Sequence, residues 1–257
     1  MMSNFIHLQT KSHYSISCGL PKTNEIVDKA IEKGMDAVAL ADKNTFFGLV
    51  KFYNYALKKG IKPICGVDFD VKVSNGYTNL NLLAKNKKGL ENIFKHSTES
   101  FITSGIEKRS VLEEDILKNS SDLVCILPAS STNIKNLASK KAKELIEAEL
   151  AKYSDAFGNN FFLGASCFNE QGYDQATSFV CNIAHGKNIP VVALNDVLFL
   201  EKEDHLAHQA KVAINNSTLL KDEIDNPVVS NEQYFKTREQ LSTIHEDEPL
   251  NLSLIHI

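Results

Sequence analysis

The feature of this sequence that most constrains its fold is a repeated alternation of short apolar runs with longer amphipathic stretches. The run at 36–41, DAVALA, is apolar, as expected of a strand buried on both faces. A stretch of helical periodicity follows at 45–59, and Gly60 ends it. The same pattern predicts further strands at 5–8, 62–71, 79–84, 122–127, 161–165 and 190–194. It predicts further helices from Thr23 or Asn24 to Gly34, after 84 through 93–94, and at 111–118, 131–153, 173–187, 206–214 and 237–245.

Strands that alternate with helices in this way indicate an α/β protein with a parallel sheet. The 257 residues are compatible with one large domain. Periodicity alone does not separate a barrel from a doubly wound sheet.

Composition excludes several classes of protein. Lys and Arg number 28 against 32 Asp and Glu, so the chain as a whole has no basic footprint for nucleic acid. The five cysteines are far apart and include no CxxC pair, which favours reduced thiols over disulfides or a zinc ribbon. The sequence contains neither a secretory signal nor a run long enough to cross a bilayer, so we expect a cytoplasmic protein.

Polar residues stand at the carboxyl ends of several predicted strands, where parallel barrels place their functional sites. These residues are Gln9, Asp42, Asp68 and Asp196. The sequence therefore predicts one shared pocket at this end of the sheet.

Five segments in order carry a resemblance to a known family. They are FIHLQTKSHYSISCG at 5–19, GMDAVALADKNTFFGLVKFYNYALKKGIKPICGVDFDV at 34–71, LLAKNKKGLENI at 82–93, IPVVALNDVLFL at 189–200 and QYFKTREQL at 233–241. Together they resemble the PHP (polymerase and histidinol phosphatase) domain at the amino terminus of bacterial DNA polymerase III alpha subunits. The resemblance implies a distorted (β/α)7 barrel with parallel strands. It also implies a PHP domain over 1–248, with a barrel core at about 5–200 and helices and loops at 201–248 that lead towards a polymerase domain. We interpret 249–257 as a truncated tail.

The resemblance also identifies a vestigial metal pocket, in which most of the family's ligands are replaced. Gln9 and Lys11 stand where the family has two histidines, and Lys43 and Leu198 each replace a further histidine. Asp42 and Asp196 are kept, and Asp68 stands where the family has a glutamate. Asn79 lies near another histidine position, and Ala129 lies near a cysteine position. Leucine cannot coordinate a metal and a protonated lysine repels one, so we expect no metal here.

The two lysines suggest a replacement for the lost cations. We hypothesise that the ammonium groups of Lys11 and Lys43 pair with Asp42, Asp68 or Asp196, which would otherwise repel one another. The alternative is that both lysines point to solvent, as lysines usually do.

The resemblance implies a function for the longer protein and a different one for this chain. The family protein is a template-directed DNA polymerase that uses two divalent metals, expected to be Mg²⁺, in a palm domain outside this sequence. This segment would hold no catalytic residue and no cofactor. It would be a scaffold for the proofreading exonuclease (epsilon) subunit and other DNA polymerase III holoenzyme subunits, with DNA contacted mainly by other regions and no membrane contact. The alternatives are a metal-dependent phosphoesterase or 3′–5′ exonuclease with a reduced cluster on Asp42, Asp68 and Asp196, and an unrelated α/β barrel.

Two histidine features have simpler interpretations. His205 and His208 are spaced i, i+3 on a predicted helix, which suits either a metal site or, as we favour, a solvated helix face. His7 belongs to the first strand, where we expect a packed ring with a backbone partner.

Overall fold

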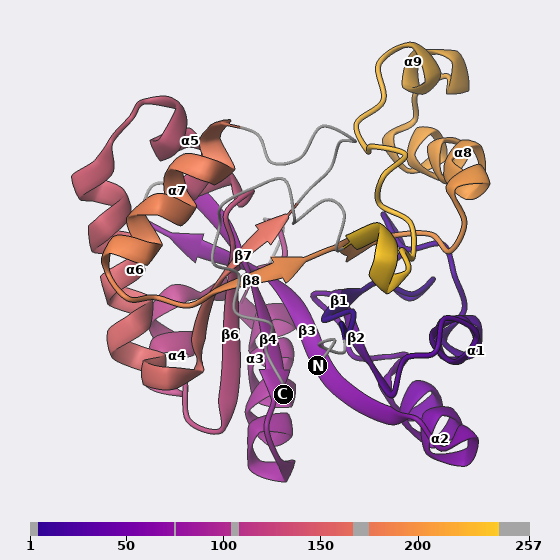
Figure 1. Ribbon diagram of the computed structural model, residues 1–257, viewed down its shortest axis with the longest axis horizontal. Coiled ribbons are helices and arrows are strands. Elements are labelled where there is room, and N and C mark those ends of the chain that lie inside the picture. The colour runs from indigo at the N-terminus through magenta and orange to yellow at the C-terminus, as the bar shows by residue number, and fades with distance from the viewer. Residues whose placement is uncertain (1–4, 75, 104–107, 167–174, 242–257) are drawn as a thin grey trace.

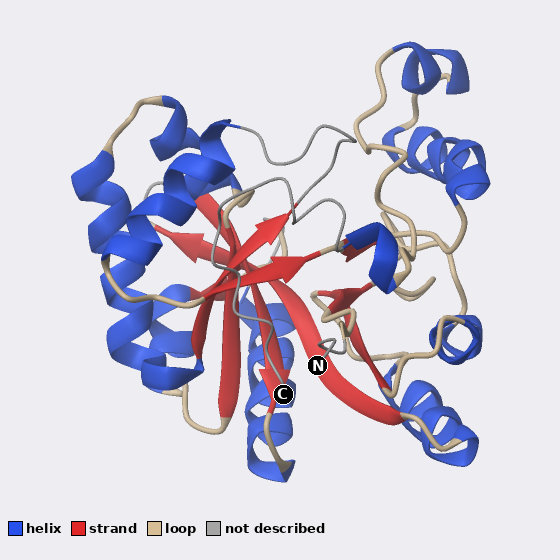
Figure 2. Ribbon diagram, in the orientation of Figure 1, coloured by secondary structure: helices blue, strands red, loops and turns tan. Residues whose placement is uncertain are grey.

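The computed structural model describes residues 5–74, 76–103, 108–166 and 175–241, and its elements follow the predicted alternation (Figures 1 and 2). The strands are β1 (Gln9–Thr10), β2 (Ala37–Lys43), β3 (Lys62–Val73), β4 (Gly76–Ala84), β5 (Val111–Leu112), β6 (Leu123–Pro128), β7 (Phe161–Ser166), β8 (Val191–Leu194) and β9 (Asp196–Val197). The helices are α1 (Thr23–Glu32), α2 (Leu49–Lys59), α3 (Lys87–Thr103), α4 (Glu113–Lys118), α5 (Thr132–Ser139), α6 (Lys143–Phe157), α7 (Gln175–Gly186), α8 (His205–Asn216) and α9 (Leu220–Asp225). The predicted α/β class is confirmed.

The main sheet has the order β2-β3-β4-β6-β7-β8, with β5 added beside β3. Its pairs are parallel except those of β4, which runs antiparallel to both β3 and β6. The expectation of a wholly parallel sheet is therefore wrong at this one strand. The physical reason is the short connection from Val73 to Gly76, which suits a hairpin but is far too short for a crossover helix.

The short strand β1 connects the two ends of this curled sheet. It pairs in parallel with β9, which follows β8 after a single residue, and the amide of Lys11 donates to the carbonyl of Val197 at 2.9 Å. On its other side the carbonyl of His7 accepts a hydrogen bond from the amide of Ala39 in β2. The curled sheet encloses an apolar interior that consists of Leu8, Ala37, Ala39, Ile64, Leu83, Val124, Ile126, Val192 and Leu194.

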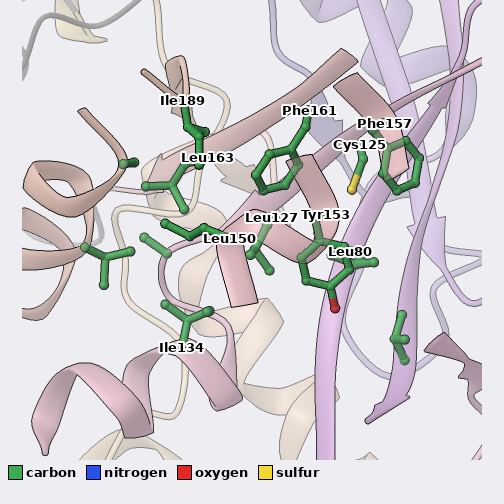
Figure 3. Close-up of a cluster of buried hydrophobic side chains, with 14 of the residues drawn as sticks. Leu80, Cys125, Leu127, Ile134, Leu150, Tyr153, Phe157, Phe161, Leu163 and Ile189 are labelled. Carbon is green, nitrogen blue, oxygen red and sulfur yellow. The ribbon is translucent and has the colours of Figure 1, made fainter. Parts of the chain in front are cut away.

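The outer face of the sheet is covered by helices, with the larger cluster on the side of α3 to α7. Figure 3 shows Tyr153 and Phe157 of α6 beside Phe161 and Leu163 of β7 and Leu80 of β4. The rings of Tyr153 and Phe161 stack with centroids 5.9 Å apart. A second cluster beneath α1 and α2 includes Ile26, Phe52 and Val38.

Several helix boundaries differ from their predictions. The N-cap of α1 is Lys22 rather than Thr23 or Asn24, and its amide donates to the Glu25 carboxylate at 2.8 Å. The predicted helix at 131–153 is two helices, because Lys141 adopts a left-handed φ of 52° between them. Gly34 and Gly60 have positive φ at helix ends as predicted. Helix α9 was not predicted, and of the predicted helix at 237–245 the described part is helical at 238–241.

The segment after β9 returns to the barrel. Helices α8 and α9 lie above α1 in Figure 1, and the chain then runs back so that Tyr234 forms a parallel bridge with Phe199. The buried ring of His7 contacts the carbonyl of Lys236 through Nε2 at 2.9 Å, which confirms its packed role. The tail at 249–257 lies outside the described residues. None of the described helices has the length and apolar character needed to cross a membrane.

Candidate functional site

A pocket of about 850 Å³ lies at the carboxyl ends of the strands. Its lining comes from the loop after β1, from the end of β2, from β3 and β4, and from 228–233. The side chains of Lys11, Lys43, Asp68, Asn79, Asp196 and Leu198 all line it. These are six of the nine residues that the sequence assigned to one pocket.

Lys11 is the centre of the charged network. Its Nζ lies 3.1 Å from Oδ2 of Asp68 and also pairs with Oδ1 of Asp196. Only 3% of the Lys11 side chain is exposed, and the same holds for Asp68. Asp68 of β3 and Asp196 of β9, which are far apart in the sequence, are thus joined through one ammonium group.

Lys43 extends this network on the neighbouring strand. Its Nζ lies 3.5 Å from Oδ1 of Asp68 and 3.1 Å from Oδ1 of Asp70. Lys108 pairs with the same Asp70 oxygen at 3.1 Å. Three ammonium groups therefore balance three carboxylates in the pocket, and the hypothesis that both lysines point to solvent is wrong.

Asp42 is held in a different way. Its carboxylate accepts hydrogen bonds from the amide of Ser12 at 2.7 Å, from Oγ of Ser12 at 2.8 Å and from Oγ of Ser15 at 2.6 Å. In the described part of the chain no lysine forms a salt bridge with it. The expectation that Asp42 converges with Asp68 and Asp196 is therefore not met, because alternate residues of a strand face opposite ways and Lys43, not Asp42, shares the face of its register partner Asp68.

The two environments shift the aspartate pKa values in opposite directions. Burial by itself would raise the pKa of Asp68, but Lys43 and Lys11 hold it below its usual range. Burial raises the pKa of Asp42, and hydrogen bonds from Ser15 and Ser12 offset this only in part. For Lys11, burial would lower the pKa, yet the carboxylates of Asp196 and Asp68 raise it above the usual lysine value.

The remaining predicted residues lie in varied positions. Gln9 is buried, and its side-chain amide donates a hydrogen bond to Asp68 at 3.3 Å, so it belongs to the network. Leu198 is buried and presents an apolar wall. Ala129 packs in the large hydrophobic cluster and is not among the pocket's lining residues, so its place in the predicted pocket is not supported by the geometry.

Sequence reasoning missed five residues of the site: Ser12, Ser15, Asn44, Asp70 and Lys108. Asp70 carried a usable signal, because it lies two residues after Asp68 on the same strand and must therefore face the same way. Lys108 had none, since it follows α3 and reaches the pocket only through the tertiary fold.

The histidine pair on α8 is not a solvated face. His208 is fully buried, and its Nε2 lies 2.7 Å from the carbonyl of Cys18, while Nε2 of His205 lies 2.9 Å from the carbonyl of Val229. Each imidazole ring thus contacts a backbone carbonyl of a neighbouring loop, at Cys18 for His208 and at Val229 for His205. Among the described residues, no three His, Cys, Asp or Glu side chains are grouped so as to hold a metal ion.

With the fold and the site in view, comparison with known proteins defines the class. The family model of the PHP domain matches residues 7–165, which is more than half of the chain. The chain therefore belongs to this family.

Within the family, the chain is similar to the amino-terminal region of DNA polymerase III alpha subunits. It is 33% identical over 253 residues to that of Haemophilus influenzae and 32% identical over 250 residues to that of Pasteurella multocida. Each match covers 95% of this chain but only 21% of the relative. The chain therefore spans about a fifth of the length of these curated relatives.

Among solved structures, the fold resembles that of an amidohydrolase from Chromobacterium violaceum. The TM-score is 0.55 at 12% identity, over 75% of this chain and 87% of the other. At this identity the likeness concerns the fold alone, and it agrees with the predicted PHP-type barrel.

Proposed function

We propose that this chain is the PHP domain of a DNA polymerase III alpha subunit, and that the intact protein is a DNA-directed DNA polymerase of the replicative holoenzyme in the cytoplasm. The support is the continuous match to alpha subunits over 95% of the chain. Nucleotidyl transfer, with its Mg²⁺ ions, would then belong to regions of the protein outside this sequence, which would also make most of the DNA contacts.

Within that protein we propose that the pocket is a structural element without a catalytic metal. The observation that carries this proposal is the position of Lys11, whose ammonium group lies between Asp68 and Asp196. A divalent cation at these carboxylates would have to displace Lys11 and would be repelled by Lys43 and Lys108. The donors that remain are carboxylates already paired with ammonium groups, so the residues present do not fit a metal cluster.

Elemental analysis after incubation with zinc and manganese tests this proposal. We expect far less than one equivalent of bound metal. The matched variant carries Gln9→His, Lys11→His, Lys43→His and Leu198→His together, which places imidazoles beside Asp68 and Asp196, and we expect this variant to retain metal. Stoichiometric metal in the unmodified chain would contradict the proposal.

We further propose that the domain serves as a scaffold that docks the proofreading exonuclease subunit. In a PHP domain whose pocket is filled by its own lysines, the exterior is left to carry the function. Calorimetric titration of the chain with the purified exonuclease subunit should give one-to-one binding that Asp196→Asn leaves unchanged. Absence of binding would remove the scaffold role but not the polymerase assignment.

The alternative function is a metal-dependent phosphoesterase or 3′–5′ exonuclease. It predicts metal-stimulated hydrolysis of a phosphodiester that Asp196→Asn abolishes. The serine contacts of Asp42 and the lysine contacts of Asp68 disfavour it, because both carboxylates would have to exchange several partners before they could bind a metal.

A further inference from the structure

A second surface, distinct from the charged pocket, follows from the antiparallel strand of the sheet. The parallel pairs β2–β3, β6–β7 and β7–β8 are each joined through helices that pack on the outer face of the sheet. The antiparallel pair β3–β4 is joined by a hairpin, so in the described part of the chain no crossover helix covers the sheet between α2 and α3. Figure 1 shows β3 running between these two helices.

The uncovered region is an apolar groove of about 650 Å³, which we call the α2–α3 groove. Val50 and Tyr53 form one wall on α2, Leu90 and Phe94 form the other on α3, and Pro63 and Cys65 of β3 lie between them. The ring of Phe94 also packs against that of Phe46, with centroids 4.5 Å apart. The groove is thus bounded by a helix on each side.

The wall on α2 exposes more apolar surface than a solvated helix needs. Val50 is 68% exposed, Tyr53 43% and Leu57, one turn further along, 54%. They are spaced i, i+3 and i+7, so they form one stripe along the helix. Contiguous exposed apolar surface of this kind marks an interaction site.

The charge around the groove indicates what would occupy it. Lys85 and Lys87 line the groove, and Nζ of Lys85 also donates to Oδ1 of Asn160 at 2.8 Å. Lys58 on α2 and Lys95 on α3 are exposed. Between Lys87 and Lys95 on α3, Glu91 is the one residue with a carboxylate side chain. The rim is therefore positive, although the chain carries a net charge of −4. A partner with an apolar stripe and acidic flanks matches both features.

We propose that the α2–α3 groove binds an amphipathic α-helix of a partner protein, with its apolar stripe on Val50, Tyr53 and Phe94 and carboxylates on its flanks facing Lys85 and Lys87. A helix fits because the groove lies between α2 and α3, in the layer of helices that covers the outer face of the sheet. Helix-in-groove recognition uses anchors at i, i+3 or i+4 and i+7, the same spacing as the stripe on α2. This proposal does not depend on the polymerase assignment or on the state of the pocket.

The test uses the 257-residue chain and two designed peptides of about 16 residues, or roughly four helical turns. Both carry the same leucine stripe, and their flanks are glutamate in one and lysine in the other. Fluorescence anisotropy should show saturable one-to-one binding of the glutamate peptide, at least about tenfold tighter than the lysine peptide. Equal affinity for both peptides, or no saturable binding, would overturn the proposal.

Two sets of variants locate the binding site. Val50→Asp with Leu57→Asp should weaken the glutamate peptide about tenfold or more, and Lys85→Glu with Lys87→Glu should reverse the preference between the peptides. Because all four side chains are exposed, folding should be unaffected. The control, Leu145→Asp with Leu206→Asp, changes exposed leucines on α6 and α8 and should leave binding unchanged. Loss of binding in the control alone would overturn the proposal. Self-association of the chain that the groove variants abolish would also overturn it, because the occupant of the groove would then be a second copy of the chain.

Discussion

Asp68 and Asp42 are both buried carboxylates on neighbouring strands, yet the protein stabilises them by different means. Asp68 lies among Lys11, Lys43 and the Gln9 amide, and its pKa is lowered. Asp42 is surrounded by hydroxyl and amide donors from the loop after β1, and its pKa is raised. The comparison teaches that neutral donors satisfy the hydrogen bonds of a buried carboxylate but do not fully repay its desolvation, whereas two ammonium groups do.

The largest expected effect comes from removal of the central cation. Lys11→Met leaves Asp196 without its ammonium partner and Asp68 with Lys43 alone, and we expect the free energy of unfolding to fall by about 3–5 kcal/mol. Urea denaturation measures it. The control Lys118→Met breaks an exposed pair with Glu114 and should leave the midpoint unchanged. Adding Asp68→Asn to Lys11→Met should restore part of the loss, and a loss no larger than in the control would mean that Lys11 does not neutralise the pocket.

An intermediate effect is expected on the serine side. Ser15→Ala removes the 2.6 Å hydrogen bond to Asp42 and the acceptor of the Lys43 amide. Hydrogen bonds to charged groups are worth about 1.5–3 kcal/mol, and we expect a loss of stability in that range. Ser17→Ala is the matched control, because Ser17 lies on the exposed part of the same loop. Equal thermal unfolding curves for the two variants would show that the serine contacts of Asp42 contribute little.

The smallest effect is the pH dependence, which should have opposite signs at the two sites. The folded pKa of Asp68 is lowered, so its contribution to stability is present above the ordinary aspartate pKa of about 4 and is lost as the pH falls through the folded value. The difference in unfolding free energy between the unmodified chain and Asp68→Asn should therefore become smaller as the pH falls from 7 to 3. The folded pKa of Asp42 is raised, so its contribution is full below about pH 4 and is lost as the pH rises through the folded value.

Asp42→Asn should accordingly gain stability relative to the unmodified chain as the pH rises from 3 to 7. Each unit of pKa shift corresponds to about 1.4 kcal/mol, so chemical denaturation at several pH values can resolve the trend. Parallel curves for Asp42→Asn and Asp68→Asn would contradict the distinction between the two environments.

Much of the fold could be predicted because its signals are local. The apolar runs of β2, β6 and β8 and the glycines that end α1 and α2 are each determined by a few adjacent residues. The hairpin β3–β4 was missed although its signal is present, since no helical stretch separates the two predicted strands. The break at Lys141 could not be predicted, because nothing in its side chain requires a left-handed backbone.

The residue types alone establish the chemistry of the pocket, with lysines at 11 and 43 and aspartates at 42, 68 and 196. Which of these charges meet depends on the tertiary structure. Lys11 and Asp196 are 185 residues apart and become neighbours because β1 pairs with β9, whereas Asp42 turns away from its predicted partners because of strand alternation. The pairing of these charged side chains depends on the register of the strands and on which face of the sheet each side chain occupies. Both follow from how the whole sheet closes.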